Sequence, residues 1–168
     1  MTIEAVREAS WYSELHPRQQ ALVELSFQLY EREKQINSNL VDYAFIVFPI
    51  AKAYEGFLKQ FLFDLSLINE NTFEGKRFRI GRALNPDINQ KQRDEFWLYD
   101  DISRYCGEAL AKTLWQAWLE CRNKVFHYYP LSVTALSLTQ AFACVVEVSQ
   151  AMESAVTCKV EDNHRARH

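Results

Sequence analysis

The sequence predicts an all-α fold, a bundle of four main helices with one short extra helix. Turn residues are scarce, because the 168-residue chain holds only 4 Gly and 4 Pro, too few for a fold of many short strands. Apolar side chains recur at helical spacing over several long stretches. With 48% hydrophobic residues the chain can bury one core. We expect one helical domain over residues 1–158 and a polar, disordered tail over residues 159–168.

Each element follows from its apolar spacing and its boundary residues. The first predicted helical segments are residues 2–16, 17–34 and 40–68. A further helical region follows Asp94 and either ends at Gly107 or continues past it, and helical spacing runs from Glu108 to residues 122–129. The last predicted helix follows Ser132 and carries apolar residues as far as Val156. Pro17 suits a first helical turn, residues 37–39 form a break with an N-cap, and Pro49 should kink or split the third segment. Residues 69–92 are predicted to form a long connection, and Ser132 is predicted to cap the last helix.

Charge and cysteine usage narrow the classes of function. The net charge is -3, so a nucleic-acid-binding surface must be a local basic patch. Cys106, Cys121, Cys144 and Cys158 form no C-x-x-C pair and lie in apolar helical patterns. We therefore expect reduced, packed thiols, which favour a cytoplasmic protein together with the absence of a signal-peptide pattern. No apolar run is long enough and free enough of charge to span a bilayer.

The most informative segment is the octapeptide Arg122-Asn-Lys-Val-Phe-His127-Tyr-Tyr129, which closes a helical stretch before Pro130. In a helix, Asn123 lies four residues before His127, so the two share one face. Arginine carries a permanent planar charge that matches two phosphate oxygens, and imidazole titrates near neutral pH. Arg122 therefore suits stabilisation of a phosphate group on which negative charge develops, and His127 suits proton transfer.

This octapeptide resembles the signature of the HEPN superfamily of helical ribonucleases. That signature is an arginine, four to six residues and a histidine, often with an asparagine after the arginine. Arg122, Asn123 and His127 match it. Tyr129 matches a tyrosine that lies two residues past the histidine in HEPN toxins paired with nucleotidyltransferase antitoxins. In those toxins this tyrosine is where the antitoxin attaches adenylate.

A second stretch resembles one branch of the superfamily. Residues 45–59 are similar to the upstream helix of the HEPN domain in RNase LS-type toxins. In that helix a basic residue and a glutamate three positions apart accompany the arginine and the histidine. Lys52 and Glu55 occupy these positions, with lysine where the branch has arginine. The resemblance covers residues 40–156.

The resemblance implies a HEPN-like up-and-down four-helix bundle that acts as a metal-independent endoribonuclease, in the role of a toxin or an anti-phage effector. In HEPN nucleases the motif helices of two protomers meet, which implies a homodimer with a composite site around the RNA substrate. Attack by the 2′-hydroxyl would leave 2′,3′-cyclic phosphate and 5′-hydroxyl ends. An antitoxin or regulatory protein is an expected partner, and no membrane is expected.

Two sets of candidate site residues result. The predicted catalytic residues are Arg122, His127, Glu55 and Asn123. The predicted substrate-binding residues are Lys52, Tyr129, Lys76, Arg77, Arg79 and Arg82. Glu55 and Lys52 lie one helical turn apart and are suited to orienting Arg122. The four loop cations alternate with Phe78, a pattern suited to an RNA backbone and one stacked base. No His, Cys, Asp or Glu cluster has ligand spacing, so no metal or cofactor is expected.

Each assignment has a structural alternative. Glu55 can form a helix-face ion pair with Lys52 or Lys59, Tyr129 can be a packed aromatic residue, and the basic loop can be a solvated turn. Two alternatives concern the whole chain. One is a catalytically silent HEPN-type helical module that binds a protein partner or a nucleotide. The other is a generic four-helix adaptor in which the octapeptide merely ends a helix.

Overall fold

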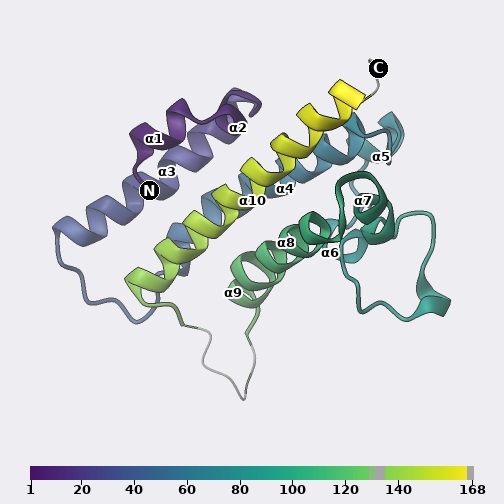
Figure 1. The fold of residues 1–168 in the computed structure, drawn as a ribbon. Helices are drawn as coiled ribbons and strands as arrows, with labels where there is room; N and C mark the ends of the chain where they lie inside the picture. Colours follow the sequence, from purple (N-terminus) through teal and green to yellow (C-terminus); the bar gives the residue numbers. More distant parts are fainter. Residues whose placement is uncertain (129, 131–134, 166–168) are drawn as a thin grey trace.

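The computed structural model describes the backbone of residues 1–128, 130 and 135–165, with side chains up to Lys159. All regular structure in this part of the chain is helical, which confirms the predicted all-α class (Figure 1). The elements are α1 (Ile3–Glu8), α2 (Ser10–Ser13), α3 (Pro17–Gln35), α4 (Ala44–Asp64), α5 (Glu70–Glu74), α6 (Ile80–Ala83), η1 (Gln90–Gln92), α7 (Tyr99–Cys106), α8 (Glu108–Trp118), η2 (Leu119–Asn123), α9 (Lys124–Phe126) and α10 (Leu138–Arg165).

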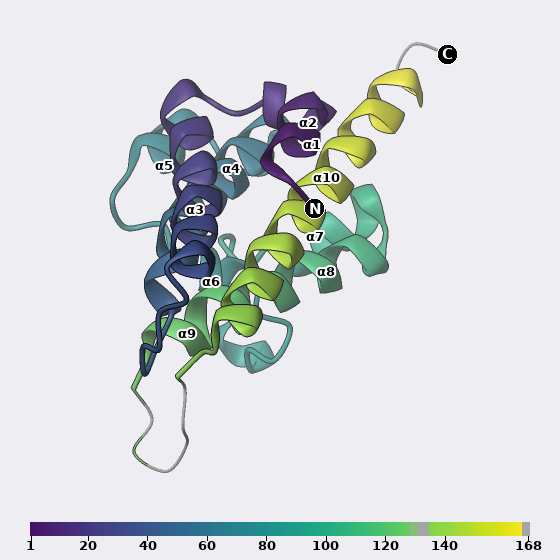
Figure 2. The same cartoon turned by 90° about the vertical axis from the view of Figure 1, so that its left-hand side faces the viewer.

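Four long segments form the predicted bundle: α3, α4, the continuous stretch from α8 through η2 to α9, and α10 (Figure 1, Figure 2). Helix α4 lies at its centre, in contact with α3, α10 and η2, and α10 also packs on α3 and α8. A helix with neighbours on several sides must be apolar around most of its circumference. The buried side chains of α4 accordingly include Ile46, Val47, Ile50, Tyr54, Phe57, Leu58, Phe61 and Leu62. No helix in the described ranges is long and apolar enough to cross a membrane.

Buried polar contacts fix α4 between its neighbours. The Tyr54 hydroxyl donates a hydrogen bond of 3.0 Å to the Leu114 carbonyl of α8. Burial raises the pKa of Tyr54 well above its usual value, so the phenol remains a neutral donor. On the other side, the Ile50 amide donates to the buried Ser26 hydroxyl of α3 at 3.0 Å. Because this contact lies next to Pro49, α3 supports the turn that the proline disturbs, and α4 is not split there.

The N-terminal segment differs in detail from the prediction. Residues 2–16 form two short helices, because Ala9 between them has an extended backbone (φ −73°, ψ 139°). Helix α3 then begins at Pro17 as predicted. Its first turn is capped from both sides, because the Gln19 side chain accepts from the His16 amide at 2.9 Å and His16 Nδ1 accepts from the Arg18 amide at 3.3 Å. The position at which α3 begins is thus fixed by the hydrogen bonds of its N-cap.

The predicted long connection over residues 69–92 contains short helices. Asn69 caps α5 by accepting from the Thr72 amide, and α6 and η1 follow. Ile80, Ala83 and Leu84 are buried, so these apolar residues hold the segment onto the bundle. The predicted long connection is therefore not one continuous loop, because three short helices interrupt it.

The prediction of four reduced cysteines is wrong for two of them. Cys106 at the end of α7 and Cys158 of α10 form a disulfide across a sequence separation of 52, with their Cα atoms 5.6 Å apart. Cys121 and Cys144 are free. The spacing of the cysteines could not reveal this pair, because only the packing of α7 near the end of α10 brings the two residues together.

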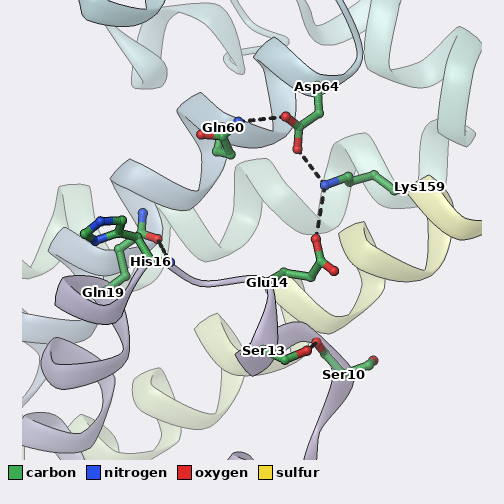
Figure 3. A network of polar contacts seen from close by, with 8 residues as sticks. All are labelled: Ser10, Ser13, Glu14, His16, Gln19, Gln60, Asp64 and Lys159. Carbon is green, nitrogen blue, oxygen red and sulfur yellow. Dashed lines mark hydrogen bonds and ion pairs between the residues drawn. The ribbon is translucent and has the colours of Figure 1, made fainter.

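The C-terminal helix extends beyond the predicted end of the domain. Helix α10 continues to Arg165, so the prediction of a disordered tail from residue 159 is wrong as far as that residue. Lys159 explains part of the difference (Figure 3). Its Nζ atom lies 2.6 Å from Asp64 Oδ2 at the end of α4 and 3.6 Å from Glu14 Oε2. The polar sequence that suggested disorder instead supplies an ion pair to the bundle.

The start of α10 also differs from the prediction. Ser132 lies outside the described residues, and the helix begins at Leu138. Ser137 and Gln140 bond reciprocally there, because the Ser137 amide donates to the Gln140 side chain at 2.9 Å and the Gln140 amide donates to Ser137 Oγ at 3.3 Å. This capping box identifies Ser137 as the N-cap residue of α10.

Candidate active site

A cleft of about 410 Å³ opens between α4 and the end of α9, and we call it the α4–α9 cleft. Its lining residues are Phe48, Ala51, Lys52, Glu55, Arg122, Phe126 and His127. Two segments that are far apart in the sequence therefore meet at one surface. The cleft contains four of the predicted site residues.

Helix α4 supplies one wall because its outer face is the part not buried by the bundle. Phe48, Lys52 and Glu55 are spaced by four and three residues, so they follow one another along one helical face. The opposite face carries buried residues such as Tyr54. Lys52 is exposed and Glu55 is half-buried, so both charged ends reach the cleft without losing their solvation.

The other wall depends on a π-helical turn that the sequence pattern did not predict. Element η2 interrupts the α-helix over Leu119–Asn123 and carries Arg122. Such turns alter the angular position of the residues that follow and occur often at functional sites. Cys121 faces the core, with none of its surface exposed, while the neighbouring Arg122 reaches the cleft.

The helix ends earlier than predicted. Helix α9 stops at Phe126, and His127 has an extended backbone (φ −111°, ψ 135°). The expectation that Asn123 and His127 share one helical face is therefore wrong. Asn123 is half-buried and is not among the residues that line the cleft, whereas His127 is exposed at its edge. Tyr129 lies outside the described residues.

Arg122 is held from two directions. Its Nη2 atom lies 3.7 Å from Glu55 Oε2, and its guanidinium carbon lies 4.8 Å from the centre of the Trp118 ring. An exposed ion pair of this kind adds little stability, but the two contacts together restrict where the guanidinium can point. The Arg122 side chain keeps 34% of its surface exposed, so it can still bind an anion.

The ion pair decides between two interpretations of Glu55. The alternative in which Glu55 pairs with Lys52 or Lys59 is wrong, because its ion-pair partner is Arg122. Lys59 instead donates to the backbone carbonyls of Phe73 at 3.4 Å and Gly75 at 3.1 Å. Glu55 is therefore in a position to orient Arg122.

Aromatic residues that the sequence did not single out flank the charged group. Phe48 and Phe126 pack edge to face with ring centres 5.7 Å apart, although Phe48 keeps 57% of its surface exposed. Their exposure could not be read from the sequence, since both lie in apolar stretches that also contain buried residues such as Val47 and Val125. Trp118 is buried, and its ring still contacts the Arg122 guanidinium.

The predicted loop cations lie at a different cleft. Its volume is about 460 Å³, and we call it the basic cleft. Its lining residues are Asn71, Thr72, Gly75, Lys76, Arg77, Phe78, Arg79, Arg82 and Phe96. Arg82 is bonded to Asp94 at 2.7 Å and to the Gln92 carbonyl at 2.6 Å. The sequence grouped these cations correctly but did not identify Phe96 beside them.

Neither a cluster of metal ligands nor a reactive Cys121 thiol is found among the described residues. Within the described ranges, no group of three or more His, Cys, Asp or Glu side chains could hold a metal ion. A hydrogen bond with Cys144, together with burial, raises the pKa of the Cys121 thiol, so this thiol stays protonated. Cys121 is thus a packing residue, although it is the neighbour of Arg122.

Comparison with known protein families, curated proteins and solved structures gives no match to the chain. The fold and the site define an all-α helical bundle with an open cleft that carries an arginine, a glutamate, a lysine and a histidine. A functional assignment must therefore be argued from the chemistry of these side chains.

Proposed function

We propose that the chain is a metal-independent endoribonuclease of the HEPN type and that the α4–α9 cleft is its active site. The observation that carries the proposal is the meeting of Arg122, His127, Glu55 and Lys52 in one cleft of about 410 Å³. These residues come from the two stretches that carry the resemblance to HEPN ribonucleases. Cleavage of RNA without metal requires an imidazole for proton transfer and a fixed guanidinium for charge stabilisation, and it also requires an open groove that admits the strand.

The reaction uses the RNA's own 2′-hydroxyl as the nucleophile. His127 accepts the proton from this hydroxyl as the 2′-oxygen forms a bond to phosphorus, and the bond from phosphorus to the 5′-oxygen breaks. A protonated acid delivers a proton to the departing 5′-oxygen. The products are a 2′,3′-cyclic phosphate and a 5′-hydroxyl.

Charge stabilisation is the task of Arg122. The phosphorane carries more negative charge on its equatorial oxygens than the starting phosphodiester, and a guanidinium already in place stabilises it without reorganisation. Two contacts support this placement: Glu55 Oε2 lies 3.7 Å from Arg122 Nη2, and the Trp118 ring lies against the face of the guanidinium. Exposed Lys52 adds a second cation toward the phosphate, and Asn123 is assigned to holding the motif segment because it does not line the cleft.

A homodimer completes the site in this proposal. A single histidine cannot be base and acid in the same step, and a second copy of the chain supplies another His127. Exposed apolar side chains beside the cleft support an interface there. Phe45 is 39% exposed, Phe48 57%, Phe126 36% and Tyr128 85%. We further propose that the enzyme is a toxin or anti-phage effector restrained by an antitoxin or regulatory protein.

The test is an RNA-cleavage assay in EDTA with the wild type, Arg122→Ala and His127→Ala. Lys112→Ala is the control, because Lys112 is an exposed cation of α8 away from the cleft. We expect cleavage by the wild type and the control, and loss of cleavage in both site variants with the helical content unchanged. Equal activity in all four proteins would overturn the proposal. RNA binding without cleavage by the wild type would instead favour the catalytically silent HEPN-type module.

A further inference from the structure

The basic cleft combines aromatic rings with cations on a chain whose net charge is negative. We propose that this cleft binds one nucleotide unit, with its base against Phe78 and Phe96 and its phosphate on Lys76, Arg77 and Arg79. If the bound unit is part of an RNA strand, the inference rests on the proposed function, because the scissile phosphate of the same strand then lies at Arg122.

The aromatic part of the cleft has two rings at different angles. The centres of Phe78 and Phe96 are 6.2 Å apart, and their planes are inclined by 63°. Phe96 keeps 41% of its surface exposed, so one ring presents an area that no other side chain covers. Every nucleobase has a flat π-face that can stack on such a ring, whatever its sequence.

The cations of the basic cleft divide into one that is paired and three that are not. Arg82 is bonded to Asp94 and to the Gln92 carbonyl, which leaves it a structural role. Among the described residues, no carboxylate forms an ion pair with Lys76, Arg77 or Arg79, and all three are exposed. Unpaired cations beside an aromatic surface are the arrangement that attracts a phosphate attached to a base.

Two contacts connect this cleft to the α4–α9 cleft. Lys59 lies four residues after Glu55 on α4, and its ammonium holds the Gly75 carbonyl at the border of the basic cleft at 3.1 Å. A Cβ atom added to Gly81 of α6 would lie 2.5 Å from Trp118 Nε1, so α6 rests directly on this indole. The Arg122 guanidinium lies over the same indole. One tryptophan thus separates the segment of the basic cleft from the proposed catalytic arginine.

The volume fits the size of the proposed ligand. A space of about 460 Å³ lies within the range of sites that hold small organic ligands, and one nucleotide is of that size. The shared chemistry is a planar base with a phosphate, which can come from an RNA strand or from a free nucleotide. These two sources need separate arms in the test.

The experiment measures binding without cleavage. The first probe is a short fluorescent oligoribonucleotide with 2′-O-methyl groups throughout, which cannot undergo 2′-hydroxyl attack, and the second is free adenosine monophosphate. The proteins are the wild type, Arg77→Ala/Arg79→Ala, Phe96→Ala, and the control Arg18→Ala/Lys112→Ala. The control removes two exposed cations, on α3 and α8, and therefore makes the same change in net charge.

We expect the oligonucleotide to bind the wild type and the control alike. The double variant should bind it more weakly, and the slope of log affinity against log salt should fall in magnitude by about 0.7, because the two arginines contact one phosphate and each neutralised phosphate of a single strand contributes about 0.7. Phe96→Ala should weaken binding roughly ten-fold through lost stacking, with the salt slope unchanged. Binding of adenosine monophosphate with the same variant dependence would assign the cleft to a free nucleotide as well.

The inference is overturned if neither probe binds, or if Phe96→Ala and the double variant bind both probes as tightly as the wild type. Because the probes cannot be cleaved, these outcomes do not depend on the proposed ribonuclease activity. A protein that binds the oligonucleotide through the basic cleft but cuts no RNA would support this inference while removing the proposed function.

Discussion

The two clefts have similar volumes, about 410 and 460 Å³, but Arg122 in the α4–α9 cleft and the three unpaired cations of the basic cleft are held in opposite ways. In the α4–α9 cleft, Arg122 is restrained by Glu55 and by the Trp118 ring. In the basic cleft, Lys76 and its two neighbouring arginines have no ion-pair partner among the described residues. A restrained charge suits stabilisation of a transition state, whereas unrestrained exposed charges suit binding of a flexible polyanion. In our two proposals, the α4–α9 cleft therefore carries the chemical step and the basic cleft carries the binding affinity.

The largest expected effect is on the chemical step. His127→Gln should lower kcat by roughly 10²–10⁴-fold, because it removes positioned proton transfer, while the affinity for the 2′-O-methyl oligonucleotide stays the same. Arg77→Ala/Arg79→Ala should show the converse, a higher KM with kcat retained. Steady-state cleavage kinetics with both proteins measure the separation. A fall in kcat of equal size in both would contradict the division of roles between the clefts.

The next effect tests how Arg122 is held. Glu55→Gln keeps the shape of the side chain but removes its charge, so the guanidinium loses one of its two restraints. We expect kcat to fall roughly 10²-fold, since small displacements of a catalytic group are costly. Glu120→Gln is the matched control, because Glu120 forms an ion pair of 2.7 Å with Lys124, and neither residue lines the cleft. Equal loss in the two variants would show that the charge of Glu55 has no special role.

A smaller effect should arise from the contact between α6 and Trp118. In Gly81→Ala the added methyl group would meet the rigid indole beneath Arg122, so the ring must shift. We expect kcat to fall and the free energy of unfolding to drop by about 1–3 kcal/mol. Gly56→Ala is the control, because its Cβ would meet only the flexible end of Gln19. Cleavage rates and thermal melts of both variants measure these effects. If Gly81→Ala is as active and as stable as Gly56→Ala, the proposed coupling between α6 and Arg122 is contradicted.

The smallest expected effect on catalysis comes from the disulfide. Reduction of the bond between Cys106 and Cys158, or the variant Cys158→Ser, should lower the free energy of unfolding by about 2–4 kcal/mol, because the bond closes a long loop. Since Cys106 precedes α8 and His127 follows α9, the bond and the cleft lie at opposite ends of this segment. Denaturant titration and cleavage at a temperature where the protein is folded separate the two effects. Loss of cleavage without loss of stability would contradict the prediction that the disulfide supports the fold and not the catalytic step.

Local patterns carried much of the fold. Apolar spacing located α3 and α4. The three-residue spacing of Lys52 and Glu55 placed both residues on one face of α4, and this face does line a cleft with Arg122 and His127. These features depend on helical periodicity, which a sequence displays directly.

Features that depend on non-local packing could not be predicted. The π-helical turn that carries Arg122 reflects how α8 fits against α4 and α10, and no residue pattern marks it. The disulfide and the ion pairs of Lys159 join the C-terminal part of α10 to residues far away in the chain. Phe96 joins Phe78 only because the chain folds back after η1.

The central claim is that the α4–α9 cleft cleaves RNA by internal attack without metal, and the chemistry of the product ends tests it most directly. Wild-type protein incubated with a single-stranded RNA in EDTA should produce fragments that end in a 2′,3′-cyclic phosphate and begin with a 5′-hydroxyl. The same RNA with a 2′-O-methyl group at the cleaved nucleotide should remain intact. Fragments with 5′-phosphate ends, or cleavage that appears only when a divalent metal is added, would contradict the account.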